Sequence, residues 1–152
     1  MLGIVDQDFK GLERPTFTKR EGSAVKIAIS YDATNLYLGW EVQDDTPWVN
    51  GADAPEYLYA HGDTVDFQLG TDPQAPKQRH EAAAGDLRLS IGNFQGQPTA
   101  VLYQRVGGLA APKVFSSGVI AEYHMASVRV LPEVKVVVKV DAAKKKYAVV
   151  AA

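Results

Sequence analysis

Apolar and polar side chains alternate with a period of two residues over much of this chain. In residues 25–31 every second side chain is apolar or aromatic, and the same alternation returns in residues 36–42. Successive side chains of a β-strand point to opposite faces of a sheet, so the pattern predicts half-buried strands and not helices. Residues 32–35 are turn formers, which predicts a β-hairpin and places Trp40, on its apolar face, in the core.

The same alternation predicts a series of short strands. They are expected at residues 63–69, 86–91, 99–106, 118–124, 126–131, 133–140 and 146–152. Residues 43–62 and 70–85 break the pattern and are expected to be long loops, with one helical turn at residues 55–60. Residues 92–98 are expected to form a glycine-rich turn, and the lysines at 144–146 a solvated hairpin tip. Many short strands without a long amphipathic helix predict an all-β fold, a two-sheet antiparallel β-sandwich of immunoglobulin or jelly-roll type.

The length and composition are those of one globular domain over residues 1–152, with residues 1–14 expected to be irregular. The chain contains no cysteine, which excludes disulfides and thiolate metal sites. A net charge of −2 argues against general binding of nucleic acid, and no apolar run is long enough to cross a bilayer. We expect no signal peptide in this chain, because residues 1–10 carry aspartates and lack an apolar segment.

Short motifs follow one another in order between residues 25 and 69. Residues 29–38 carry a Tyr-Asp-turn-Leu-Tyr pattern, residues 42–45 read Val-Gln-Asp-Asp, and residues 62–67 read Gly-Asp-Thr-Val-Asp-Phe. With the C-terminal strand at 146–152, they resemble the family 9 carbohydrate-binding modules and the wider DOMON-like β-sandwiches. The resemblance implies a non-catalytic accessory domain that binds a mono- or oligosaccharide outside the cell or in its envelope. It also implies that further strands of the family fold follow residue 152.

The resemblance also implies which residues hydrogen-bond the sugar. In the family an acid, an arginine and an asparagine bind the hydroxyls, and these positions fall on Asp66, Arg88 and Ser90. Two strands that pair here would place these side chains and Gln68 on one exposed face. The alternative interpretation of Asp66 and Arg88 is a cross-strand ion pair without a ligand.

Aromatic side chains of the loop 43–62 are the candidates for stacking on the sugar. The family grips its sugar between two tryptophans, but Ala60 stands at the first of those positions and the second lies beyond residue 152. Aromatic rings cover the apolar face of a sugar, so Trp48, Tyr57 or Tyr59 could substitute from the same loop.

Acidic residues gather in and beside the same loop. Calcium takes several oxygen ligands from such a loop, and the resemblance also allows a structural calcium ion. The candidate ligands are Asp44, Asp45, Asp53 and Asp63, with Glu56 nearby. The alternative is that these carboxylates are simply solvated. Asp63 and Asp66 lie three residues apart on one strand and so face opposite sides, which argues against a glycosidase dyad.

Two further functions remain open from the sequence. Some DOMON-like sandwiches hold haem between a methionine and a histidine, and Met125 could pair with His61 or His80. Its neighbour His124 points to the opposite side of the same strand and cannot share one iron with it. The other alternative is a structural domain that has lost sugar binding and forms a homodimer through exposed strands.

Overall fold

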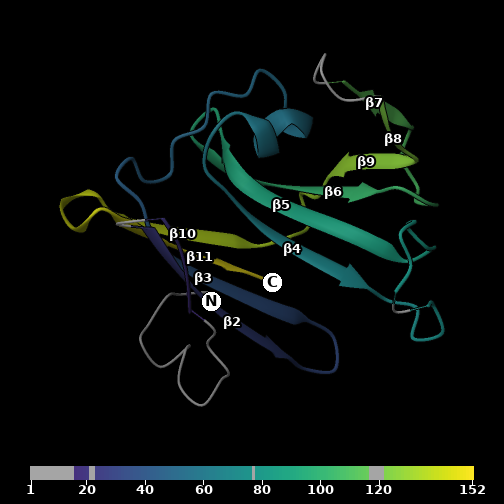
Figure 1. Ribbon diagram of the computed structural model, residues 1–152. Helices are drawn as coiled ribbons and strands as arrows, with labels where there is room; N and C mark the ends of the chain where they lie inside the picture. Colours follow the sequence, from purple (N-terminus) through teal and green to yellow (C-terminus); the bar gives the residue numbers. More distant parts are fainter. Residues whose placement is uncertain (1–15, 21–22, 77, 117–121) are drawn as a thin grey trace.

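Two antiparallel β-sheets pack face to face in the computed structural model, which describes residues 16–20, 23–76, 78–116 and 122–152 (Figure 1). The first sheet has the strand order β1-β2-β3-β11-β10, formed by Thr16–Arg20, Ser23–Tyr31, Leu36–Gln43, Lys146–Ala151 and Val136–Asp141. The second has the order β4-β5-β6-β9, formed by Thr64–Gly70, Asp86–Phe94, Gln97–Gln104 and Ser127–Val130. Outside the sheets lie the 3-10 helices η2 (Pro55–Ala60) and η3 (Ala142–Lys144) and the strands β7 (Lys113–Phe115) and β8 (Tyr123–Met125). The predicted all-β sandwich is confirmed.

The apolar core fills the space between the two sheets. Side chains at alternate positions of β3 and β11 meet side chains at alternate positions of β4, β5 and β6; the buried members are Leu38, Trp40, Val42, Tyr147, Val149, Ala151, Val65, Ile91 and Ala100. Trp40 is only 3% exposed, so its predicted core position is confirmed. Because the strand register keeps these positions on the inner faces, the two-residue alternation of the sequence becomes one continuous apolar layer.

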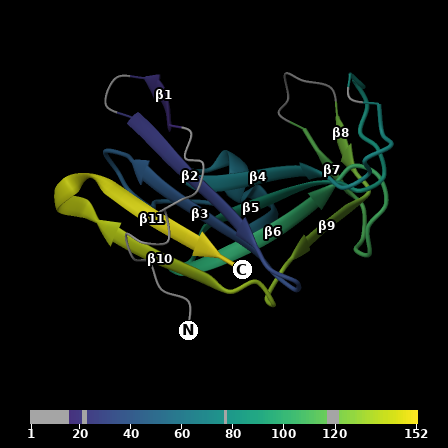
Figure 2. The same ribbon diagram turned by 90° about the horizontal axis from the view of Figure 1, so that it is seen from below.

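A third, thinner layer covers part of the outer face of the four-stranded sheet. It consists of η2, where the sequence predicts a helical turn, and of the β7–β8 hairpin (Figure 2). Leu58 of η2 is fully buried and packs with Phe115 of β7 in a cluster that includes Val101 and Tyr103 of β6. A Cβ atom at Gly92 of β5 would lie 3.2 Å from the Leu58 side chain, so the glycine allows η2 to approach the sheet closely.

Some local elements differ from those predicted. The short strands β1 and β7 are missed because five and three residues are too few to show an alternation. The predicted strand at residues 118–124 lies largely outside the described residues, and β8 begins at Tyr123. In place of a turn over residues 92–98, β5 continues to Phe94 and β6 starts at Gln97. Gln95 and Gly96, with φ of 51° and 84°, form the two-residue hairpin turn between them.

The lysine-rich tip between β10 and β11 agrees with the prediction. Lys144 and Lys145 are exposed and pair with Asp141 at 3.3 Å and Asp45 at 2.8 Å, respectively. Because both lysines are exposed, the tip is a solvated turn. Surface ion pairs of this kind contribute little to stability. Within the described ranges, no helix has the length and apolarity needed to span a membrane.

Candidate functional site

Polar side chains line up on the outer face of the four-stranded sheet. The register of β4 and β5 places Asp66 opposite Ser90 and Gln68 opposite Arg88. Directly opposite residues of an antiparallel pair lie on the same face. The expectation that these four side chains share one face is therefore confirmed, and it is the face that η2 and the β7–β8 hairpin cover only in part.

Arg88 and Asp66 form a bidentate ion pair across the two strands. The Arg88 Nε and Nη2 atoms donate to the two carboxylate oxygens of Asp66 at 3.2 and 2.7 Å. The guanidinium also lies over the rings of Tyr59 and Tyr103, 5.2 and 5.9 Å from their centroids. Burial acts to lower the pKa of Arg88, but the hydrogen bond and charge of Asp66 outweigh it and raise that pKa. A planar, charged platform is thus fixed in place on the sheet.

Ser90 holds the Asp66 carboxylate of this pair through a hydrogen bond. Its side chain is completely buried, and its hydroxyl donates a hydrogen bond to Oδ1 of Asp66. A hydroxyl with no exposed surface cannot reach a sugar without rearrangement. The prediction that Ser90 binds the ligand is therefore corrected: its role is to orient the carboxylate of Asp66.

The ring of Trp48 is buried and does not offer a face for stacking on a ligand. Only 8% of it is exposed, and its ring packs 5.3 Å from that of Tyr147 in the core between the sheets. Its backbone has a φ of 63°, and its carbonyl accepts a hydrogen bond from Asn93 at 3.1 Å. The polar loop thus turns its tryptophan inward, which corrects the expectation that Trp48 offers a face to a ligand.

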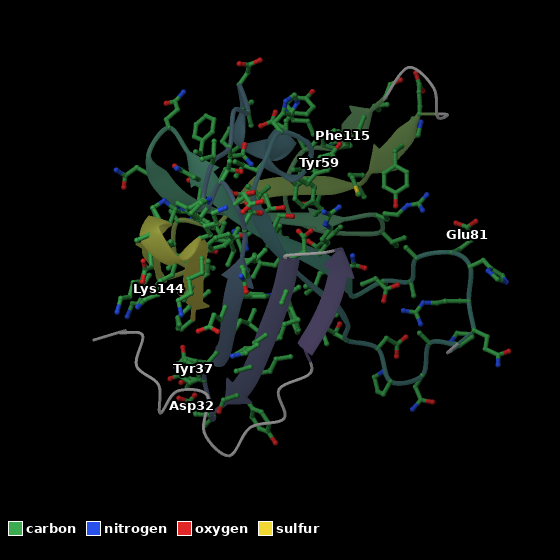
Figure 3. All side chains as sticks on the ribbon, turned by 60° about the vertical axis from the view of Figure 1, so that its left-hand side comes forward. Asp32, Tyr37, Tyr59, Glu81, Phe115 and Lys144 are labelled. Atoms are coloured by element: carbon green, nitrogen blue, oxygen red, sulfur yellow. The ribbon has the colours of Figure 1, made fainter. Side chains whose placement is uncertain are left out.

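The two loop tyrosines lie at the outer face, as Figure 3 shows for Tyr59 beside Phe115. Tyr59 is half-buried, packs edge-on against Phe115 and Tyr103, and supports the guanidinium of Arg88. Burial raises the pKa of its hydroxyl. Tyr57 is 39% exposed and stands edge-on to the ring of His61. Tyr59 therefore supports the platform, while Tyr57 is the more exposed ring.

An open pocket of about 610 Å³ lies beside the Arg88–Asp66 pair. It is bounded by the ends of β4, β5 and β6, by the loop 70–85 and by β8, and its lining includes Gln68, Arg79, Glu81, Arg88, Arg105 and Tyr123. Most of these residues carry a charge or a planar polar group. The pocket is therefore a polar hollow on the sheet, built from segments that are far apart in the sequence.

The charges of the pocket are only partly paired. Arg79 donates to both oxygens of Asp86 at 3.2 and 2.5 Å, and these hydrogen bonds, ahead of one from Ala83, hold the pKa of Asp86 below its ordinary value. The guanidinium of Arg105 lies 4.4 Å from the centroid of the Tyr123 ring. In the part of the chain that the structure describes, no carboxylate pairs with Arg105. The pocket therefore holds two neutralised ion pairs beside Arg105 and Glu81, which have no ion pair among the described residues.

Sequence reasoning identifies Asp66, Arg88 and Gln68 but misses Arg105 and Tyr123. Arg105 directly follows β6, and Tyr123 begins β8, so their approach depends on how the hairpin folds back. No periodicity connects two residues in such positions. The available signal is only compositional, because an arginine and a tyrosine flank a segment that contains three glycines and one proline.

The four candidate calcium ligands have other partners or lie apart. Asp44 accepts from the Thr46 amide at 2.7 Å, Asp45 pairs with Lys145 at 2.8 Å, and Asp53 is exposed; Asp63 accepts from the Val49 amide at 2.8 Å. Burial raises the pKa of Asp63. Among the described residues, no three histidine or acidic side chains converge as a metal site requires. The structure does not bring the predicted ligand set together.

The histidines are also separated. His80 and Met125 both line the pocket, whereas His61 lies beside Tyr57 and His124 stands 3.4 Å from Glu122.

Comparison with protein-family models, with curated proteins and with solved structures finds no match for this chain. Inference about function therefore depends on the geometry of the pocket and of the Arg88–Asp66 pair.

Proposed function

We propose that this chain is a non-catalytic carbohydrate-binding domain whose sugar lies in the pocket beside Arg88. The observation that carries the proposal is the Arg88–Asp66 ion pair, fixed by Ser90 and Tyr59 at the edge of an open polar pocket. A sugar presents neighbouring hydroxyls that act as donors and acceptors together. Arg88 lines the pocket, and the guanidinium N–H groups that do not bond Asp66 can donate to such hydroxyls.

The remaining lining of the pocket supports a sugar ligand. The Gln68 amide carries a donor and an acceptor and lies next to Arg88 across the strands. Tyr123, which is 43% exposed, offers an aromatic surface for the apolar side of a sugar ring. A volume of about 610 Å³ suits a ligand of one to a few rings.

The carboxylates near the pocket do not suit hydrolysis. Glycosidases need one carboxyl group that holds a proton near neutral pH and a second that is ionised. Asp66 is held by Arg88, and the pKa of Asp86 is lowered by Arg79. Both groups are therefore committed to an arginine, and the exposed Glu81 alone does not supply the two carboxyl groups that hydrolysis needs.

One observation favours a second candidate, haem binding. His80 and Met125 line the same pocket from opposite segments of the chain, and this pair of residue types can ligate haem iron. The charged lining of the pocket argues for a sugar instead. Purified protein incubated with haemin distinguishes the two, because haem ligation gives a sharp Soret band and the sugar-binding proposal expects none.

Titration calorimetry of the full chain against a panel of oligosaccharides tests the proposal. We expect weak binding of at least one sugar, because an open site orders the ligand for little buried apolar area. Tyr123→Ala should lower the affinity about fivefold, as an aromatic contact contributes roughly 1 kcal/mol. The matched control is Tyr31→Ala, since Tyr31 is 81% exposed and lies on β2 of the other sheet.

The control should bind like the unaltered chain, and both variants should keep its melting temperature within a few degrees. If no sugar of the panel produces heat with the folded chain, the carbohydrate proposal is wrong. Equal loss of affinity in both tyrosine variants would also overturn it, because the sugar would then not lie in this pocket.

A further inference from the structure

The charged side chains of the pocket favour one class of sugar over others. Two of its three arginines, Arg79 and Arg88, are already neutralised by Asp86 and Asp66. Arg105 is the third, and among the described residues it has a ring contact with Tyr123 but no ion pair or hydrogen bond. A guanidinium is a fork of donors that matches a carboxylate, so this open cation marks the place where a ligand anion would lie.

From this arrangement we infer that the pocket takes an acidic sugar, an oligosaccharide with a uronic-acid residue whose carboxylate pairs with Arg105. The inference rests on the proposed function and names the class of its ligand. The Arg105 guanidinium carbon lies over the Tyr123 ring, 4.4 Å from its centroid, and this stacking fixes the guanidinium against one face of the ring. A uronic-acid residue carries a carboxylate on the sugar ring itself, so the ring would contact the exposed part of Tyr123 while the carboxylate pairs with Arg105.

The acidic side chain of the pocket that lacks an ion pair among the described residues, Glu81, fits the same ligand. Glu81 is exposed and lies on the loop 70–85, a different segment from Arg105, and Figure 3 shows it standing out from the sheets. In the described part of the chain it forms no ion pair, so its oxygens are open to accept hydroxyl hydrogen bonds. One open cation and one open acceptor complement a sugar with one carboxylate and several hydroxyls. An amino sugar would instead place its ammonium group beside Glu81 and away from Arg105, so it is the competing ligand.

The test compares trimers of similar size by calorimetry with the full chain. The probes are trigalacturonate, its methyl ester, a neutral galactose trimer and a glucosamine trimer. We expect trigalacturonate to bind at least tenfold more tightly than the other three, and its affinity to fall as sodium chloride is raised, because salt screens exposed charges. Acetate at the same concentration should not compete, because the sugar supplies the remaining contacts.

Two charge variants locate the contact. Arg105→Gln should lower the affinity for trigalacturonate about tenfold, which corresponds to about 1.4 kcal/mol, and should lower the affinity for the neutral galactose trimer by much less. Lys139→Gln is the matched control, since it removes the same charge from β10 of the other sheet and should change neither affinity.

The outcomes separate the two proposals. If neutral or amino sugars bind as tightly as trigalacturonate, or if Arg105→Gln and Lys139→Gln behave alike, the acidic-sugar inference is overturned and sugar binding stands. Competition by acetate as strong as that by trigalacturonate also overturns the inference, because the site would then recognise a bare anion. Absence of binding by every sugar overturns the proposed function itself.

Discussion

Leu58→Ala should destabilise the chain by about 3 kcal/mol. Leu58 is completely buried between η2 and the outer face of the four-stranded sheet. Truncation to alanine removes about 2 kcal/mol of transfer free energy, at roughly 0.8 kcal/mol for each methylene-sized group. The cavity left behind adds about 1 kcal/mol, because the surroundings relax only in part. Close packing around Leu58, whose side chain would lie 3.2 Å from a Cβ atom at Gly92, limits that relaxation.

Urea denaturation followed by tryptophan fluorescence measures this loss. Leu109→Ala is the matched control, because Leu109 is 94% exposed and the same atoms are removed from water-exposed surface. The control should change the free energy of unfolding by less than about 0.5 kcal/mol. A loss below about 1 kcal/mol in Leu58→Ala would refute the reasoning, since η2 would then not be packed on the sheet as a third layer.

Two further predictions concern the hairpin tip and the acidic loop. The Asp32 carboxylate accepts hydrogen bonds from the Thr34 and Asn35 amides and the Tyr37 hydroxyl at 2.8, 2.7 and 2.7 Å; these bonds, that from Thr34 foremost, lower its pKa below the ordinary 3.8 (Figure 3). A carboxyl group whose pKa is lowered by folding stabilises the fold fully at pH values above its ordinary pKa, and this stabilisation decreases as the pH falls below it. Asp32→Asn should therefore lower the melting temperature at pH 7 by more than at about pH 2. A difference in melting temperature that does not depend on pH would contradict this. Excess chelator should leave the midpoint of thermal unfolding unchanged, because the loop carboxylates do not converge, whereas a fall in the midpoint would reveal a bound ion.

The sheets could be predicted from the sequence because a strand that is buried on one face carries an apolar residue at every second position. Val65 and Ile91 are buried at alternate positions of their strands, and the register places each opposite the other. The same logic puts Asp66 and Arg88 on the other face of that strand pair. Alternation thus determines which side chains face the core and which face the pocket.

The loops could not be predicted in the same way, because long-range contacts decide where their side chains point. Trp48 lies in a polar segment whose composition favours exposure, yet the ring of Tyr147 from the last strand holds it in the core. Arg105 and Tyr123 meet only because β8 folds back beside the end of β6. Such contacts leave no periodic trace in the sequence.

The separation of the candidate calcium ligands has a related reason. The charge of Asp44 acts on Asp63, but each carboxylate accepts a hydrogen bond from a backbone amide of the same loop. Acidic residues that stabilise turns have the same composition as acidic residues that bind calcium. Only the directions of the side chains distinguish the two roles.

Nuclear magnetic resonance mapping of the bound sugar tests the central claim most directly. An isotope-labelled chain is titrated with the oligosaccharide that binds most tightly in calorimetry. We predict that the largest amide and side-chain shifts fall on Gln68, Arg88, Arg105 and Tyr123, which line the pocket. Shifts confined to other surfaces, such as the hairpin tip around Asp32, or no saturable shifts at all, would contradict the account.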